Sequence, residues 1–431
     1  MEKVSISRLD LIKISIPLII GSLLEPIASV IDNAFVGNLS TSWLASLAYG
    51  TMILSSFSWI FNFIIHVTTE SISKKFETGS KDDLIGMTQI SLLIGLSISL
   101  FTILFLYLFY PILFELIGVK EELFQITRKY FLIRLIGHPF TILFLTTISL
   151  LRGISKTKET MIFLLISVVL NSGFNYLFLY IYQFGPEYAA WGTNIAMFVA
   201  FVFSLIFHLR SIDGKMILKE RQFSLKDFFS FSSKSIHLFV RSLSLTSIFF
   251  LSTRIAGKLG VVELAAHQIL LQFWLFASFF IDGVAVVANI YLARWSHSGK
   301  IDKVKWLLKE VFFQGGCFGF IFTLVYFFGE NWLLAKFSND LSVINTIKII
   351  WPYIVFGQLI NAFAFVVDGC LFGSGDYRYL KNMMVGIFCF VFIPFALLAV
   401  YQEQLLFLWL GLIAVSISRL IIGGIKVNKI D

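Results

Sequence analysis

Residues 88–111 read TQISLLIGLSISLFTILFLYLFYP and contain no charged side chain. A helix of about 20 apolar residues is long enough to cross the hydrocarbon core of a bilayer. The whole chain has the same character, with 58% hydrophobic and 14% charged residues, against about 25% charged in an average soluble domain. A soluble fold could not bury this much apolar surface, so the sequence predicts a membrane protein.

Eleven further apolar runs have a similar length. They lie near residues 12–36, 46–72, 123–151, 160–182, 187–209, 228–256, 263–293, 306–329, 343–371, 380–400 and 404–425. The runs are long and do not alternate, which excludes the strands of a transmembrane barrel. We therefore predict an all-α membrane protein with about twelve transmembrane helices. Residues 1–13 are polar and hold no signal-peptide core, so we expect the first run to be retained as a span.

Basic residues gather in alternate connections between these runs. Residues 74–81, 152–158 and 210–226 are rich in Lys and Arg, whereas residues 37–42 carry no charge. This is the positive-inside pattern, so we expect a multi-pass protein of the cytoplasmic (inner) membrane with both termini in the cytoplasm. The pattern also explains the net charge of +8 without nucleic acid as a partner.

The two halves of the sequence repeat each other weakly. One constant offset in the numbering aligns Gly37 and Leu44 with Gly257 and Leu264, and Gly153 with Gly373. The longest polar connection lies at mid-chain. We predict an N-terminal six-helix lobe at 1–210, a cytoplasmic connection at 211–226 and a C-terminal six-helix lobe at 227–431. Two pseudo-symmetric lobes around a central cavity are typical of transporters.

The first span carries two carboxylates, at Glu25 and Asp32. Ser22, Glu25 and Asp32 share one helix face, and Pro26 removes a backbone donor beside them. An ionisable residue inside a span is costly, roughly 2.5–3.5 kcal/mol on insertion scales, and therefore suggests function. Asp32 and Glu25 are candidate coupling groups on a bent, moving helix. The alternative is a carboxylate that only reaches the outer interface.

Other polar residues inside the spans are candidates for the same purpose. Asn171 and Asn175 lie one turn apart, and Thr193 begins the following span; an interhelical hydrogen bond is the alternative for the two Asn residues. In the second half, polar residues are candidates for the wall of the cavity. The alternative role for Arg241 is a structural ion pair with one Asp. The candidate cavity residues there are Arg241, Gln268, Gln272, Asp282, Asn361 and Asp368.

Five segments, in this order and spacing, resemble the multidrug and toxic compound extrusion (MATE) transporters, particularly their DinF-like branch. They are residues 16–37 with Pro26 and Asp32, and residues 150–153, 189–193, 264–268 and 368–373. The resemblance implies cation-coupled antiport of amphipathic, often cationic compounds. It also implies a coupling-ion site at Asp32, Asn171, Asn175 and Thr193. Asn175 departs from members with a second Asp at that position, which favours the proton over sodium as coupling ion.

Enzyme signatures such as a P-loop, GxSxG or HExxH are absent from the sequence. We therefore expect a proton-coupled antiporter, with sodium as the alternative ion, rather than an enzyme. We expect no organic cofactor and no firm metal site. The partners would be a small-molecule substrate and the lipid bilayer, and the protein would be a monomer. The alternatives are a flippase for lipid-linked or polysaccharide precursors and a membrane-embedded enzyme such as an acyltransferase.

Overall fold

The computed structural model describes residues 7–213, 223–296 and 298–430, apart from the side chains of Glu25 and Thr41. The described residues form helices and their connections, with no strand among them. Contacts divide the chain into two compact units, which are described separately. We call Leu23–Ser233 the N-terminal unit, and Lys234–Asp431 together with Met1–Ser22 the C-terminal unit.

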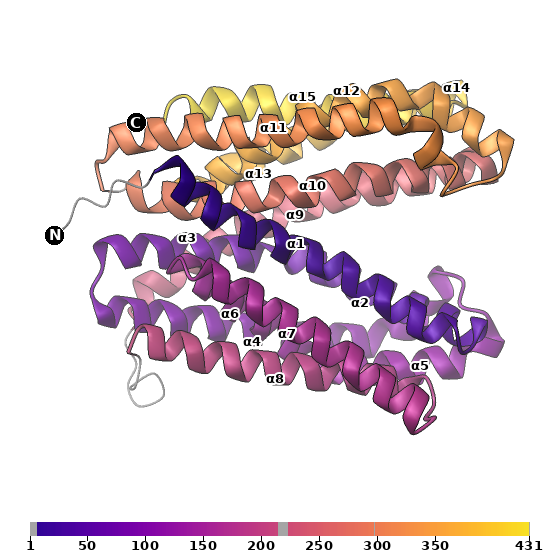
Figure 1. Cartoon of the computed structure of the whole chain (residues 1–431), viewed down its shortest axis with the longest axis horizontal. Helices are drawn as coiled ribbons and strands as arrows, with labels where there is room; N and C mark the ends of the chain where they lie inside the picture. Colours follow the sequence, from indigo (N-terminus) through magenta and orange to yellow (C-terminus); the bar gives the residue numbers. More distant parts are fainter. Residues whose placement is uncertain (1–6, 214–222, 297, 431) are drawn as a thin grey trace. The chain divides into compact units, whose positions relative to one another are not determined.

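Helix α1 (Arg8–Gly37) begins in the C-terminal unit and ends in the N-terminal unit (Figure 1). The other helices of the N-terminal unit are α2 (Thr41–Phe61), α3 (Phe63–Thr78), α4 (Lys81–Leu116), α5 (Glu121–Ile136), α6 (His138–Gly153), α7 (Thr157–Tyr176), the π-helical turn η1 (Leu177–Ile181) and α8 (Glu187–Ser211). Helix α9 (Leu225–Leu259) is divided like α1, at Ser233.

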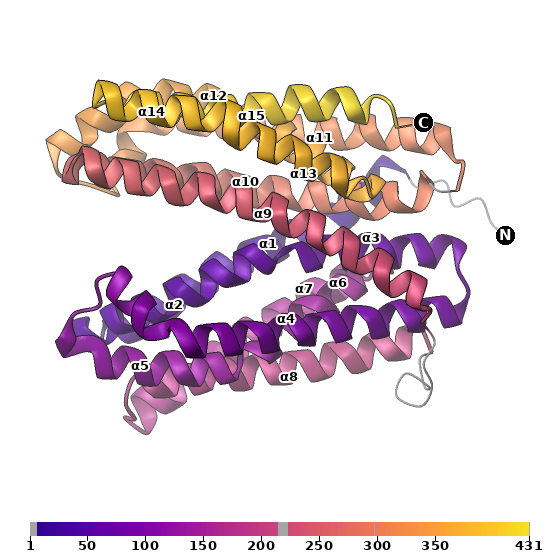
Figure 2. The ribbon, with the colours of Figure 1, turned by 180° about the vertical axis from the view of Figure 1, so that it is seen from behind.

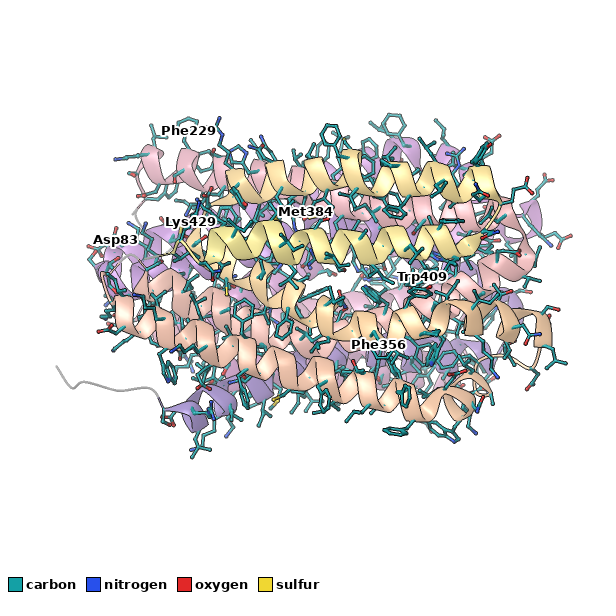
Figure 3. All side chains as sticks on the ribbon, turned by 90° about the horizontal axis from the view of Figure 1, so that it is seen from above. Asp83, Phe229, Phe356, Met384, Trp409 and Lys429 are labelled. Carbon is teal, nitrogen blue, oxygen red and sulfur yellow. The ribbon has the colours of Figure 1, made fainter. Side chains whose placement is uncertain are left out.

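The C-terminal unit contains the remaining helices, of which α14 and α15 run side by side (Figure 2). They are α10 (Val261–Trp295), α11 (Ile301–Leu334), α12 (Leu341–Ser374), α13 (Tyr377–Ile387), the π-helical turn η2 (Phe388–Phe392), α14 (Ile393–Gln402) and α15 (Leu405–Val427). In Figure 3, Trp409 lies near one end of α15 and Lys429 lies just beyond the other.

The predicted number of spans is confirmed for the described part of the chain. Eleven helices there are long and apolar enough to cross a membrane, and counting α5 with α6 as one bent span gives twelve. The bend is 45° and falls at Gly137, where His138 and Pro139 follow. A proline near the start of a helix is tolerated because its missing N–H would have no partner there. The predicted run 123–151 is therefore broken rather than straight.

The same contacts recur in both units at the offset that aligns the two halves of the sequence. A Cβ added to Gly153 would lie 2.5 Å from Ile72 Cγ2, and one added to Gly373 would lie 2.8 Å from Leu292 Cβ. The second pair is the first shifted by that constant offset (373 − 153 = 292 − 72). Helices that approach this closely require glycine at the contact. The repeat seen in the sequence is thus a repeat of helix packing.

In each unit an ion pair brings two polar connections together at one end. In the N-terminal unit, Lys81 pairs with Asp213, which joins the start of α4 to the end of α8. In the C-terminal unit, Lys426 at the end of α15 lies 2.8 Å from Asp376, which caps α13. This grouping is the one that the positive-inside pattern predicts. The lobe boundaries and the membrane orientation stay predictions, and residues 214–222 of the predicted connection lie outside the described residues.

Candidate functional site

Asp32 is held by two side chains of α7 in the N-terminal unit. Asn171 Nδ2 donates to Asp32 Oδ1 across 2.6 Å, and Asn175 Nδ2 donates to the same oxygen across 2.8 Å. The two amides are one turn apart on α7, so both reach the same point of α1. The structure therefore brings together three of the five residues predicted for the coupling site.

Both amides are buried and only half satisfied. Asn171 is 3% exposed and Asn175 is 1% exposed, and the Oδ1 atom of each has no hydrogen-bond partner among the described residues. Buried polar atoms are normally paired, so such an exception calls for an explanation. A carboxylate oxygen and two amide oxygens on neighbouring turns are acceptors that a proton or a small cation can use.

Thr193 and Glu25 are the other two residues predicted for the coupling site. The Thr193 hydroxyl donates to Ala189 of its own helix, α8, across 3.0 Å. The residue before it, Gly192, packs against the site, because a Cβ there would lie 2.8 Å from Asn175 Oδ1. The side chain of Glu25 lies outside the described residues, so its predicted role stays a prediction.

Arg134 of α5 is a cation beside this site that the sequence reasoning missed. Its guanidinium interacts electrostatically with Asp32. Arg134 Nη1 also donates to Asn194 Oδ1 of α8 across 2.9 Å, and Asn194 Nδ2 donates to the Ile133 carbonyl across 2.6 Å. The signal was present, because Arg134 is an ionisable residue within the predicted span 123–151.

The C-terminal unit holds a buried carboxylate, Asp368 of α12. Its Oδ2 atom accepts hydrogen bonds from Arg241 Nη2 of α9 and from Arg419 Nη2 of α15, the latter across 2.8 Å. All three residues are buried. Arg419 was not predicted, although it also lies within an apolar run. The ion pair that was the alternative interpretation of Arg241 is thus present, with a second arginine added.

Aromatic rings complete the surroundings of these arginines. The Arg241 guanidinium carbon lies 5.2 Å from the Phe372 ring centroid, and that of Arg419 lies 4.9 Å from the Phe365 centroid. A guanidinium within about 6 Å of a ring centroid is attracted by the ring. Arg241 also interacts electrostatically with the half-buried Asp282. Two arginines and two aspartates therefore balance one another in charge.

The remaining predicted cavity residues are Asn361 of α12 and Gln268 and Gln272 of α10. Asn361 is fully buried and donates to Ser278 Oγ across 3.0 Å, which joins α12 to α10. Gln268 and Gln272 are exposed on α10. Within the described part of the chain, no group of three or more His, Cys, Asp or Glu residues is placed to hold a metal ion.

Comparison with known proteins gives the family. A family model described as MatE matches the chain twice, at residues 17–177 and 238–400. The starts of the two matches are separated by nearly the same offset as the internal repeat. The fold and these matches define a multi-pass helical transporter of the membrane. The chain belongs to the MATE family, and the predicted membership is confirmed.

Individual relatives are distant but cover most of the chain. Protein DETOXIFICATION 44, chloroplastic, from Arabidopsis thaliana is 24% identical over 96% of this chain and 81% of its own length. A probable multidrug resistance protein NorM from Streptococcus pneumoniae is 25% identical over 85% of this chain and 82% of its own. The Vibrio cholerae MATE transporter VcmN in its bent form has a similar fold, with a TM-score of 0.86, 17% identity and coverage of 97% and 96%.

Proposed function

We propose that this transporter is a proton-coupled antiporter of the cytoplasmic membrane that exports amphipathic small molecules by alternating access. One observation carries the proposal. Asp32 is a carboxylate inside a membrane span whose hydrogen bonds come from two neutral amides, at 2.6 and 2.8 Å. Neither amide carries a charge or exchanges a proton, so Asp32 is the group of this set that is suited to exchange a proton.

Sodium is the less favoured ion at this site. A sodium ion needs several oxygen ligands around a retained negative charge, and among Asp32, Asn171 and Asn175 only Asp32 can supply that charge. Asn171 and Asn175 can offer amide oxygens but no charge. The Arg134 guanidinium also interacts electrostatically with Asp32 and would repel a sodium ion bound there. A proton needs no ligand shell, so it is affected less by these features.

Helix α1 is the element that would move when the charge of Asp32 changes. Its first turns pack in the C-terminal unit, where Arg8 binds Glu310 through two hydrogen bonds of 2.7 and 2.9 Å. Its last turns pack in the N-terminal unit through Asp32. The division falls between Ser22 and Leu23, shortly before Pro26. A proton at Asp32 can shift α1 between two packings only if it binds more tightly in one packing than in the other.

A flippase for lipid-linked precursors is the second candidate, favoured by the buried Arg241 and Arg419 side chains. Such cations would suit a phosphate or another acidic headgroup. Both arginines are already bound to Asp368, so the antiporter remains the better supported proposal.

Efflux from proteoliposomes tests the coupling ion. A fluorescent amphipathic cation is loaded, and a pH gradient is imposed without sodium, then a sodium gradient with the pH clamped. We expect the pH gradient alone to drive transport. Transport driven only by sodium would contradict the proton, and transport of a labelled polyprenyl phosphate without either gradient would favour the flippase. Protein-free liposomes under the same gradients are the control.

A further inference from the structure

Helix α7 ends at Tyr176, one residue after Asn175, and the chain does not continue as an α-helix. The chain from Leu177 to Ile181 forms the π-helical turn η1, and the Tyr182 amide bonds to the Leu177 carbonyl five residues earlier. A π-turn contains one residue more than an α-turn and changes which side chains share a face. Asn171 and Asn175 are four residues apart, and the next residue on their face across the π-turn is Tyr180, five residues on.

Tyr180 uses this position to bind α1. Its hydroxyl donates to the Phe35 carbonyl across 2.8 Å. Phe35 is three residues after Asp32, so the two residues lie on the same face of α1. Asn171 and Asn175 therefore both contact α1 at Asp32, and Tyr180 contacts α1 three residues further on.

The Phe35 carbonyl needs such a donor. The last four carbonyls of a helix lack the usual amide partners. The two amides that could reach Phe35, those of Asn38 and Leu39, bond to the carbonyls of Ala34 and Val36 instead. Tyr180 thus satisfies a carbonyl at the end of α1 from another helix.

Ring contacts hold the Tyr180 side chain in place. The Phe35 ring lies edge-on to the Tyr180 ring, with centroids 5.7 Å apart. The Tyr176 ring stacks on Tyr180 at 5.8 Å. Because these contacts involve the rings, a phenylalanine at position 180 would keep them and remove only the hydroxyl. The chain thus allows the hydrogen bond to be tested alone.

We propose that Tyr180 is a positioning residue for Asp32, presented by the π-turn to anchor the outer end of α1 to α7. The anchor has a property that the two asparagines lack. Their bonds end on the Asp32 carboxyl and change with its charge, whereas the Tyr180 bond ends on a backbone carbonyl. Tyr180 therefore holds α1 against α7 in both charge states of Asp32, so that movement takes place in the part of α1 before it. The inference rests on the coupling role proposed for Asp32.

The test compares Tyr180→Phe with Tyr176→Phe, a matched control that removes a hydroxyl from the stacked neighbour. Spin labels are placed at Asn38 and Val169, which are both exposed in the N-terminal unit. Cys317 and Cys389, the exposed native cysteines, are first replaced by alanine. We expect the distance distribution between the labels to broaden in Tyr180→Phe. It should stay narrow in Tyr176→Phe and in Asp32→Asn.

Transport is measured on the same variants. We expect the maximal proton-driven rate of Tyr180→Phe to fall about three- to tenfold, the range that corresponds to one neutral hydrogen bond, with an unchanged KM for the exported compound. A wild-type distance distribution in Tyr180→Phe would overturn the anchor. A broadened distribution with a wild-type rate would overturn the positioning role. Normal coupled transport by Asp32→Asn would instead refute the coupling role, and the distances would still report on the anchor.

Discussion

Asn194 of α8 fills the space that a side chain at Gly137 would need. A Cβ added to Gly137 would lie 2.0 Å from Asn194 Cγ. The amide is fixed there because it accepts from Arg134 and donates to Ile133. The break between α5 and α6 therefore positions Arg134, which interacts with Asp32.

Gly137→Ala should consequently displace Asn194 and lower both stability and transport. Forcing extra volume into a packed region typically costs about 1–3 kcal/mol. We expect a lower unfolding temperature in detergent and a reduced rate of proton-driven efflux. Gly173→Ala is the matched control, because an added Cβ there meets nothing within 4 Å. An unfolding temperature and rate equal to those of Gly173→Ala would show that Asn194 does not hold Arg134.

Asp32→Asn should abolish gradient-driven export and leave folding intact. Asparagine has nearly the same shape and keeps an oxygen that can accept the bonds from Asn171 and Asn175, but it cannot exchange a proton. Efflux under a pH gradient and the unfolding temperature are measured together. Asp340→Asn is the control, because Asp340 is an exposed cap of α12 and asparagine caps helices equally well. Wild-type efflux by a well-folded Asp32→Asn protein is the result that would contradict the prediction.

The sequence predicted the helices well because the bilayer fixes their length. An apolar run long enough to span lipid has few alternative structures, so runs such as 88–111 lie within single helices of the structure. The repeat was visible for a related reason. Glycines such as Gly153 and Gly373 are required where helices approach closely, and they stay at the same offset in both halves.

The sequence did not show which residues pair with the buried charges. Periodicity gives the face of a helix but not the neighbour that the face meets. Asp368 was recognised, but its bond to Arg419 depends on the packing of α12 against α15. The π-turn after Asn175 was also hidden, because Leu177–Ile181 is a continuous run of apolar and aromatic residues with no glycine or proline to mark it.

Asp368→Asn should destabilise the protein rather than uncouple it. Asp368 neutralises Arg241 and Arg419 within a buried site, and removing one partner of a buried ion pair costs about 3–5 kcal/mol. We expect a strongly lowered unfolding temperature. The double variant Asp368→Asn/Arg419→Met should recover part of the loss, because Arg241 still interacts with Asp282. A stable Asp368→Asn protein without coupled transport would instead make Asp368 a coupling residue.

The orientation in the membrane can be tested at two exposed positions, Asn38 and Lys226. Asn38 follows α1 at one end of the N-terminal unit, and Lys226 lies in the first turn of α9 at the end where Lys81 pairs with Asp213. The positive-inside pattern predicts that the second end is cytoplasmic. In a background without Cys317 and Cys389, we expect an impermeant maleimide to label Asn38→Cys in intact cells. Lys226→Cys should react only after permeabilisation, and the reverse pattern would invert the proposed direction of transport.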